Sequence, residues 1–271
     1  MVQIILAIII IALGIFIFKV YPIKRVQTKD IVIAAIFVMV ELVCKRFLTI
    51  MIPLFGAESL KVGFEYLPLM IAGYFLSPSY AFLIGLCCDF IGLILVPTGF
   101  PFFGFTLVTI LVAVIPSLIK ENVKTLSENK LRYFVEGFMG VLLVGAISYV
   151  MLLENIKIND TIYTLTNSNK IILISICCLI LIAFVILIEV LKKKINDEEA
   201  KEFSTWILCV TLVEVICTLC LTPLWLDIMY SIPYVVSLCI RVVKECAVLP
   251  LEVFIGYSII KLMKRVIIKT N

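Results

Sequence analysis

The stretch Ser231–Lys261, SIPYVVSLCIRVVKECAVLPLEVFIGYSIIK, is apolar over a length that would cross a bilayer as one helix. Three charged residues, Arg241, Lys244 and Glu245, nevertheless lie inside it. A charge at the middle of a membrane costs on the order of 2.5–3.5 kcal/mol even on the mildest insertion scale. These residues must therefore find partners within the protein or bind a ligand.

The rest of the chain is equally apolar. Of its 271 residues, 63% are hydrophobic and 15% are charged. A soluble domain of this composition would expose one continuous apolar surface. The apolar runs are about 20 residues long and lack the alternation of barrel strands. We therefore expect an all-α integral membrane protein in which residues 1–271 form a single membrane domain.

Nine apolar runs are candidates for membrane-spanning helices. They are Val2–Val20, Ile31–Leu54, Val62–Leu76, Tyr80–Val96, Phe103–Ile119, Tyr133–Leu153, Ile171–Leu191, Thr205–Ile228 and Pro233–Met263. With these spans, the segments rich in Lys and Arg fall on one side of the membrane and the other segments on the opposite side. The positive-inside rule then predicts an outside N-terminus and a cytoplasmic C-terminus, as in a multi-pass protein of the bacterial cytoplasmic membrane.

The residue types give little support for a metal site, a bound cofactor or an enzyme active site. Histidine is absent, and nearly all of the ten cysteines lie in apolar runs without the paired spacing of a zinc site. No nucleophile–base pair or nucleotide-binding loop is recognisable. We expect no metal, no cofactor and no catalytic residue.

Further ionisable residues lie inside the predicted spans. They are Glu41, Lys45, Arg46, Asp89, Glu214 and Glu252. Internal pairs would account for some of them. Glu41 and Lys45 are four residues apart on one helix face and can pair, and the same spacing relates Arg241 to Glu245.

A functional interpretation concerns the cations as a group. Arg46, Lys61, Arg241 and Lys244 all fall toward the extracellular half of the predicted topology. Asp89 could neutralise Lys244 across a helix interface, but few other counter-charges are near. A cationic cavity open to the outside would suit an anionic organic ligand.

The aromatic context is compatible with such a ligand. Trp225 lies at the outer end of the eighth span, where a Trp commonly belongs to the interfacial belt. Pro223, just before it, should break the helix and free backbone groups that are tolerated only where they are buried or line a cavity. Aromatic faces beside fixed cations would suit a flat heteroaromatic acid.

Several segments resemble the substrate-binding S components of energy-coupling factor (ECF) vitamin importers, in particular the folate-specific family. The similar segments are CKRFLTI, KVGFEYLPLMIAGYFLSPSYAFLIGLCCDFIGLILVPTGFPFFGFTL, LTPLWLDIMYSIPY and RVVKECAVLPLE. They follow the order that they have in the family and together cover roughly half of the chain.

The resemblance implies a six-helix S component with about three additional helices. Helices one to four would lie in residues 30–119 and helices five and six in residues 204–265. Residues 1–22 would form an additional N-terminal helix and residues 131–192 an inserted helix pair. Such a protein would bind folate or a related pterin and deliver it to one transmembrane coupling subunit and two ATPase subunits.

The resemblance also implies a set of ligand-binding residues. They are Arg46, Lys61, Phe64, Asp89, Thr222, Trp225, Arg241 and Lys244. In this interpretation Trp225 covers the pterin–benzoate system, and the cations bind carboxylates or pterin acceptor atoms. Asp89 either accepts hydrogen bonds from the pterin or holds a cation in place.

Two departures from the family pattern leave other hypotheses open. The family's amide before the Leu-Trp-Leu motif is absent, so its contact is either missing or made by the Thr222 hydroxyl. Met39 follows Ala35 where a second small residue would complete the docking face. The chain could therefore be an S component for another vitamin or heteroaromatic compound. A stand-alone carrier that uses Asp89 and Glu214 as proton sites is a further alternative.

Overall fold

The computed structural model describes most of the chain. The described residues are 2–23, 26–54, 57–95, 101–122, 137–138, 140–141, 143–145, 147–148, 151, 155–158, 161–164, 167–194 and 197–269. Internal contacts divide the chain into two compact units. Unit one comprises Met1–Thr49, Gly63–Thr125 and Val215–Cys217, and unit two comprises Ile50–Val62, Leu126–Glu214 and Thr218–Asn271.

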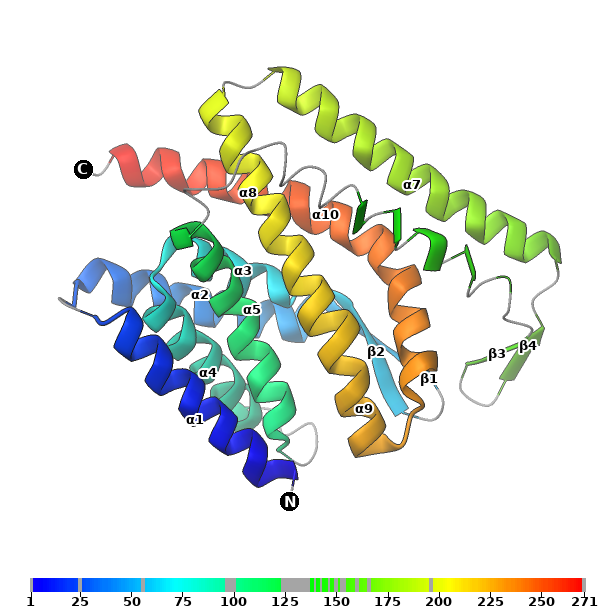
Figure 1. The fold of residues 1–271 in the computed structure, drawn as a ribbon, viewed down its shortest axis with the longest axis horizontal. Coiled ribbons are helices and arrows are strands. Elements are labelled where there is room, and N and C mark those ends of the chain that lie inside the picture. The colour runs from blue at the N-terminus through cyan, green and yellow to red at the C-terminus, as the bar shows by residue number, and fades with distance from the viewer. Residues whose placement is uncertain are drawn as a thin grey trace. The chain divides into compact units, whose positions relative to one another are not determined.

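Unit one is built from helices. They are α1 (Val2–Val20), α2 (Thr28–Phe47), α3 (Tyr66–Phe75), α4 (Pro78–Leu95) and α5 (Phe103–Asn122). The α5 helix packs along both α3 and α4 (Figure 1). Pro78 begins α4 at a position where a missing N–H costs no helical hydrogen bond.

Glycines let α5 approach its two neighbours closely. A Cβ atom added at Gly73 of α3 would lie 1.9 Å from the Ala113 carbonyl oxygen. A Cβ atom at Gly85 of α4 would lie 2.6 Å from the Ile110 Cα. The two helices therefore contact α5 backbone to backbone, which is a close packing that small residues permit in membranes.

Unit two contains short strands and the C-terminal helices. Its elements are β1 (Thr49–Leu54), β2 (Ala57–Gly63), β3 (Asn155–Ile158), β4 (Thr161–Thr164), α7 (Asn167–Lys194), α8 (Asp197–Val213), α9 (Thr222–Tyr230) and α10 (Tyr234–Lys269). The π-helix η2 (Glu214–Leu221) is shared, since Val215–Cys217 belong to unit one, as do the end residues Thr49 of β1 and Gly63 of β2. The strands form a sheet in the order β2-β1-β3-β4. The α10 helix packs against α7, α8 and α9.

The helical path from α8 to α9 changes its winding at Glu214. Residues Glu214–Leu221 form a π-helix, and Pro223 follows in the first turn of α9. Pro223 cannot donate a hydrogen bond to the preceding turn. The sequence predicted that Pro223 breaks the helix, but in the structure the helical path continues through it. The π-helical turns end at Leu221, just before the proline, and α9 continues the helical path from Thr222. Such π-helical segments frequently coincide with functional sites.

The prediction of a helical membrane protein is confirmed. Among the described residues, five helices are long and apolar enough to cross a membrane, and they cover Val2–Val20, Pro78–Leu95, Phe103–Asn122, Glu198–Tyr230 and Tyr234–Arg265. The predicted span Tyr133–Leu153 lies largely outside the described residues. The total of nine spans and their orientation stay predictions.

Two predicted spans have different bounds in the structure. The span expected at Ile31–Leu54 ends as a helix at Phe47, and its last residues form β1. The span expected at Val62–Leu76 begins as a helix only at Tyr66, because β2 extends to Gly63. Pro53 explains part of the first difference, since it cannot continue a helix. A run of apolar residues does not by itself distinguish a strand from a helix.

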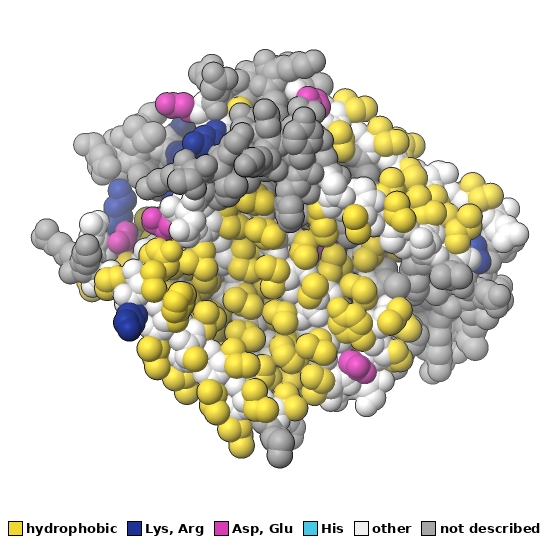
Figure 2. Space-filling view, in the orientation of Figure 1, with side chains coloured by type: hydrophobic (Ala, Val, Ile, Leu, Met, Phe, Trp, Pro, Cys, Tyr) yellow, Lys and Arg dark blue, Asp and Glu magenta, His cyan; other side chains and the backbone are white. Residues whose placement is uncertain are grey.

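Large apolar side chains cover much of the described surface. In Figure 2 they occupy most of the described face in view. On α1 the side chains of Ile4, Ile8, Ile11 and Ile15 are between 60% and 66% exposed. Lipid chains can cover such a surface, whereas its exposure to water would be energetically unfavourable.

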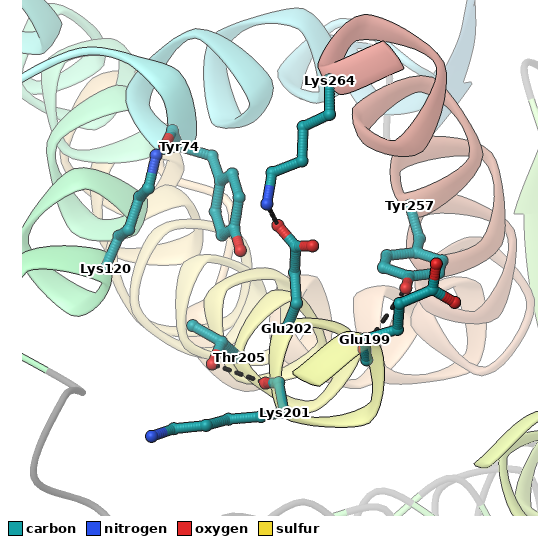
Figure 3. Close-up of polar contacts among 8 residues, drawn as sticks. All are labelled: Tyr74, Lys120, Glu199, Lys201, Glu202, Thr205, Tyr257 and Lys264. Atoms are coloured by element: carbon teal, nitrogen blue, oxygen red, sulfur yellow. Dashed lines mark hydrogen bonds and ion pairs between the residues drawn. The ribbon is translucent and has the colours of Figure 1, made fainter. Parts of the chain in front are cut away.

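Polar contacts tie the first turns of α8 to the last turns of α10. Glu202 forms an ion pair with Lys264, and the Tyr257 hydroxyl donates a hydrogen bond to the Glu199 carbonyl oxygen at 3.3 Å (Figure 3). The Glu199 carboxylate also pairs with Lys261 at 3.0 Å. These exposed or half-exposed pairs each contribute little to stability. They do fix how the two helices run past each other.

Candidate ligand-binding site

Two cations of α10 lie one turn apart and are largely buried. Arg241 is 5% exposed, and the side chain of Lys244 is 12% exposed. The Lys244 Nζ lies 2.7 Å from Oε1 of Glu245, which has no exposed side-chain surface. Adjacent residues of a helix ordinarily point in different directions. A direct ion pair between them indicates that Lys244 folds back to reach the buried carboxylate.

Two more buried carboxyl groups lie beside this ion pair. Glu214 of η2 and Glu252 of α10 are each 2% exposed. The Glu214 side chain contacts those of both Glu245 and Glu252. We call Glu214, Glu245 and Glu252 the carboxyl cluster.

Sequence reasoning did not assign this cluster, although part of the signal was present. Glu245 and Glu252 are seven residues apart, which places them on one helix face two turns from each other. Glu214 carries no such signal. Its position beside the other two depends on how the helical path from α8 to α9 packs against α10.

The predicted aromatic residue lies on the helix that precedes α10. Trp225 and Thr222 belong to α9, and each is 7% exposed. The α9 helix packs against α10. With Lys61 of β2, unit two therefore contains five predicted site residues, of which Arg241 and Lys244 are the buried cationic pair.

Three other predicted site residues belong to unit one. Arg46 lies in the last turn of α2 and is exposed, and Phe64 precedes α3 and is half-buried. Asp89 of α4 is 7% exposed. Lys61 lies on β2, and its side chain is outside the described part of the structure. One pocket shared by all the predicted residues stays a prediction.

Pairing within unit one accounts for two of its buried carboxylates. Lys45 Nζ lies 3.8 Å from Glu41 Oε1, which confirms the pair expected from their spacing. The Thr106 hydroxyl donates a hydrogen bond to Asp89 Oδ2 at 2.6 Å. Asp89 is thus positioned by α5, a partner that sequence reasoning missed. No group of three or more His, Cys, Asp or Glu side chains in the described residues is arranged to hold a metal ion.

Thr106→Val is expected to destabilise the protein by about 1–3 kcal/mol, because it leaves a buried carboxylate oxygen without its donor. Thr109→Val is the matched control, since the Thr109 hydroxyl donates only to the Phe105 carbonyl oxygen of its own helix. Thermal unfolding of the two variants in detergent measures the difference. Equal melting temperatures would contradict the assigned role of Thr106.

Apolar helices with charged groups buried between them are typical of membrane transport proteins. The comparison with protein families is more specific. The family described as "ECF-type riboflavin transporter, S component" matches residues 25–193, well over half of the 271 residues, and the chain belongs to this family. The predicted S component is thereby confirmed, and the family consists of transporter subunits and not of enzymes.

Two similar proteins carry a different vitamin in their names. The chain is 32% identical over 90 residues to the folate transporter FolT of Clostridium novyi (strain NT), over 33% of this chain and 49% of that protein. It thus spans about half the length of the curated relative it matches. The crystal structure of FolT bound with folic acid is similar in fold, with a TM-score of 0.50 and 18% identity over 88% of this chain and 97% of that one.

Proposed function

We propose that the protein captures folate or a related pterin and delivers it into the cell through a shared ATP-driven ECF module. The observation that carries this proposal is the buried pair of Arg241 and Lys244 on α10, with Trp225 on the neighbouring helix. Buried cations in a membrane protein commonly mark a substrate pathway, and these two lie one turn apart on α10 beside the Glu245 carboxylate. An anionic ligand with a flat aromatic ring system uses both the charges and the indole.

Folate differs in charge from riboflavin, the vitamin in the family's description. Folate carries the carboxylates of its glutamate moiety, whereas riboflavin is an uncharged heteroaromatic alcohol. Arg binds a carboxylate through two parallel hydrogen bonds, and Lys adds a point charge. The cationic pair therefore favours folate, in agreement with the name of the relative that is 32% identical. Riboflavin is the second candidate, because the family model is described by it.

Purified protein is expected to bind folate without ATP and to bind riboflavin much more weakly. Isothermal titration calorimetry with each vitamin in the same detergent measures both affinities. An excess of the second vitamin in a displacement titration tests whether the two share a site. Tight riboflavin binding with no folate binding would assign the protein to the other vitamin, and binding of neither would contradict the proposed function.

The proposed partners are a transmembrane coupling subunit and two ATPases, in the cytoplasmic membrane of a bacterium. The exposed apolar side of α2 supports a contact within the membrane, since Ile36, Met39 and Val43 are each more than half exposed. Met39 makes this side bulkier than one lined by small residues. Co-purification of the ATPases with the tagged protein, expressed together with the module, tests the assembly.

A further inference from the structure

The carboxyl cluster has more hydrogen-bond acceptors than donors. Oε2 of Glu214 and Oε2 of Glu252 are buried and find no hydrogen-bond donor among the described residues. Glu214 nevertheless contacts both of the other carboxyl groups. Both side-chain oxygens of Glu245 likewise lack a hydrogen-bond donor in the described part of the chain, and the close positive charge at Glu245 is the Lys244 ammonium at 2.7 Å. Buried carboxylates are unfavourable without such a partner, so the state of Glu245 depends on Lys244.

The charges that face the cluster come from α10. Lys244 interacts with Glu245 and Glu214, and Arg241 interacts with Lys244. The one charged residue of α9, Asp227, is exposed. The acidic residues at the start of α8 are far from the cluster, because the twelve residues from Glu202 to Glu214 span about 18 Å of helix. On α7, Glu189 is half-buried and has contacts of its own.

Lys244 is at once the counter-charge of Glu245 and one of the cations proposed to bind the ligand. Its ammonium has three N–H donors, and a ligand carboxylate that binds it competes with Glu245 for them. When the ammonium turns to the ligand, Glu245 loses the partner that lies 2.7 Å away. An ionised carboxylate that is buried without a partner is strongly unfavourable, and such a group takes up a proton instead.

We propose that ligand binding is coupled to the uptake of a proton by the carboxyl cluster, with Glu245 as the principal acceptor. This inference rests on the proposed function, because it needs an anionic ligand that pairs with Lys244. The balance is simple: one ligand carboxylate gains the Lys244 ammonium, one proton moves from solvent to Glu245, and no covalent bond other than O–H changes. Each ligand that binds from outside is thus accompanied by the uptake of about one proton.

Calorimetry of the unmodified protein tests the coupling directly. Folate is titrated at pH 7 in two buffers with different ionisation enthalpies, and the difference in measured heat gives the number of protons taken up. We expect about one proton per ligand, together with a dissociation constant that rises up to tenfold for each pH unit above neutrality. Equal heats in the two buffers would overturn the proton coupling and leave the folate proposal intact. Absence of folate binding would overturn the proposed function.

Two variants locate the proton. Glu245→Gln is expected to bind folate with no proton uptake and with an affinity that no longer changes with pH. Glu202→Gln is the matched control, because it removes one carboxylate from an ion pair with Lys264 at the far end of the helix pair. It should keep the uptake of the unmodified protein. Full proton uptake by Glu245→Gln would overturn the assignment to Glu245.

Discussion

Arg241→Ala is expected to weaken folate binding by roughly 30-fold to several thousand-fold. Arg241 is 5% exposed and lies one turn from Lys244, so its guanidinium is desolvated before the ligand arrives. Removing one partner of a buried, hydrogen-bonded charge pair costs about 2–5 kcal/mol, and each 1.4 kcal/mol changes the affinity about tenfold. Arg241→Lys should recover part of the loss, because it restores the charge but not the two-point contact.

Arg265→Ala is the matched control for this experiment. Arg265 belongs to the same helix, and its replacement by alanine removes the same guanidinium group, but its side chain is exposed. Calorimetric titration with folate gives the affinities, and thermal melting shows whether each variant is folded. We expect Arg265→Ala, like a change of Lys264, to bind as the unmodified protein does. Similar losses for Arg241→Ala and Arg265→Ala would place the site elsewhere.

Gly73→Ala is expected to have the largest effect on folding. The added Cβ would lie 1.9 Å from the Ala113 carbonyl oxygen, and a backbone atom cannot move aside as a flexible side chain does. Helices α3 and α5 would have to separate, and overpacking of this kind typically costs about 1–3 kcal/mol or more. That is a large part of the total stability of an ordinary domain. The yield of monodisperse protein and its melting temperature in detergent measure the effect.

Gly92→Ala provides the control within the same unit. At Gly92 the nearest atoms to an added Cβ, in Leu42 and Lys45, lie 3.6 Å away, which is ordinary contact. Alanine favours helix over glycine by about 1 kcal/mol, so this variant should melt at the same temperature or slightly higher. If both variants melted alike, the close contact of α3 with α5 would not be important for stability.

The helices with long apolar runs could be predicted from the sequence because a bilayer imposes a length and a polarity on each span. The α1, α4 and α5 helices begin and end within a few residues of the predicted bounds. Helix ends were predicted less accurately where an apolar run continues into residues that form a turn or a strand. The segment Thr49–Leu54, which the apolar pattern predicts as the end of a helix, forms β1. Hydrophobicity reports burial in lipid or core, but it does not report which backbone conformation satisfies the hydrogen bonds.

Local spacing likewise predicted the pairs that lie on one helix. Glu41 and Lys45 are four residues apart, and their ion pair follows from helix geometry alone. The Lys244–Glu245 contact does not follow from spacing, because neighbouring side chains diverge on a helix. It forms because a buried carboxylate with other carboxyl groups around it attracts the closest cation.

The sequence alone determined that this protein is a helical membrane protein with charges inside its spans, and motifs of an ECF S component were readable in it. Only the tertiary structure decided what those charges face. Thr106 reaches Asp89 from another helix, and Glu214 reaches Glu245 and Glu252 from a π-helical turn. Such contacts join residues far apart in the chain, and their distances depend on how whole helices pack. A pattern along one helix cannot encode them.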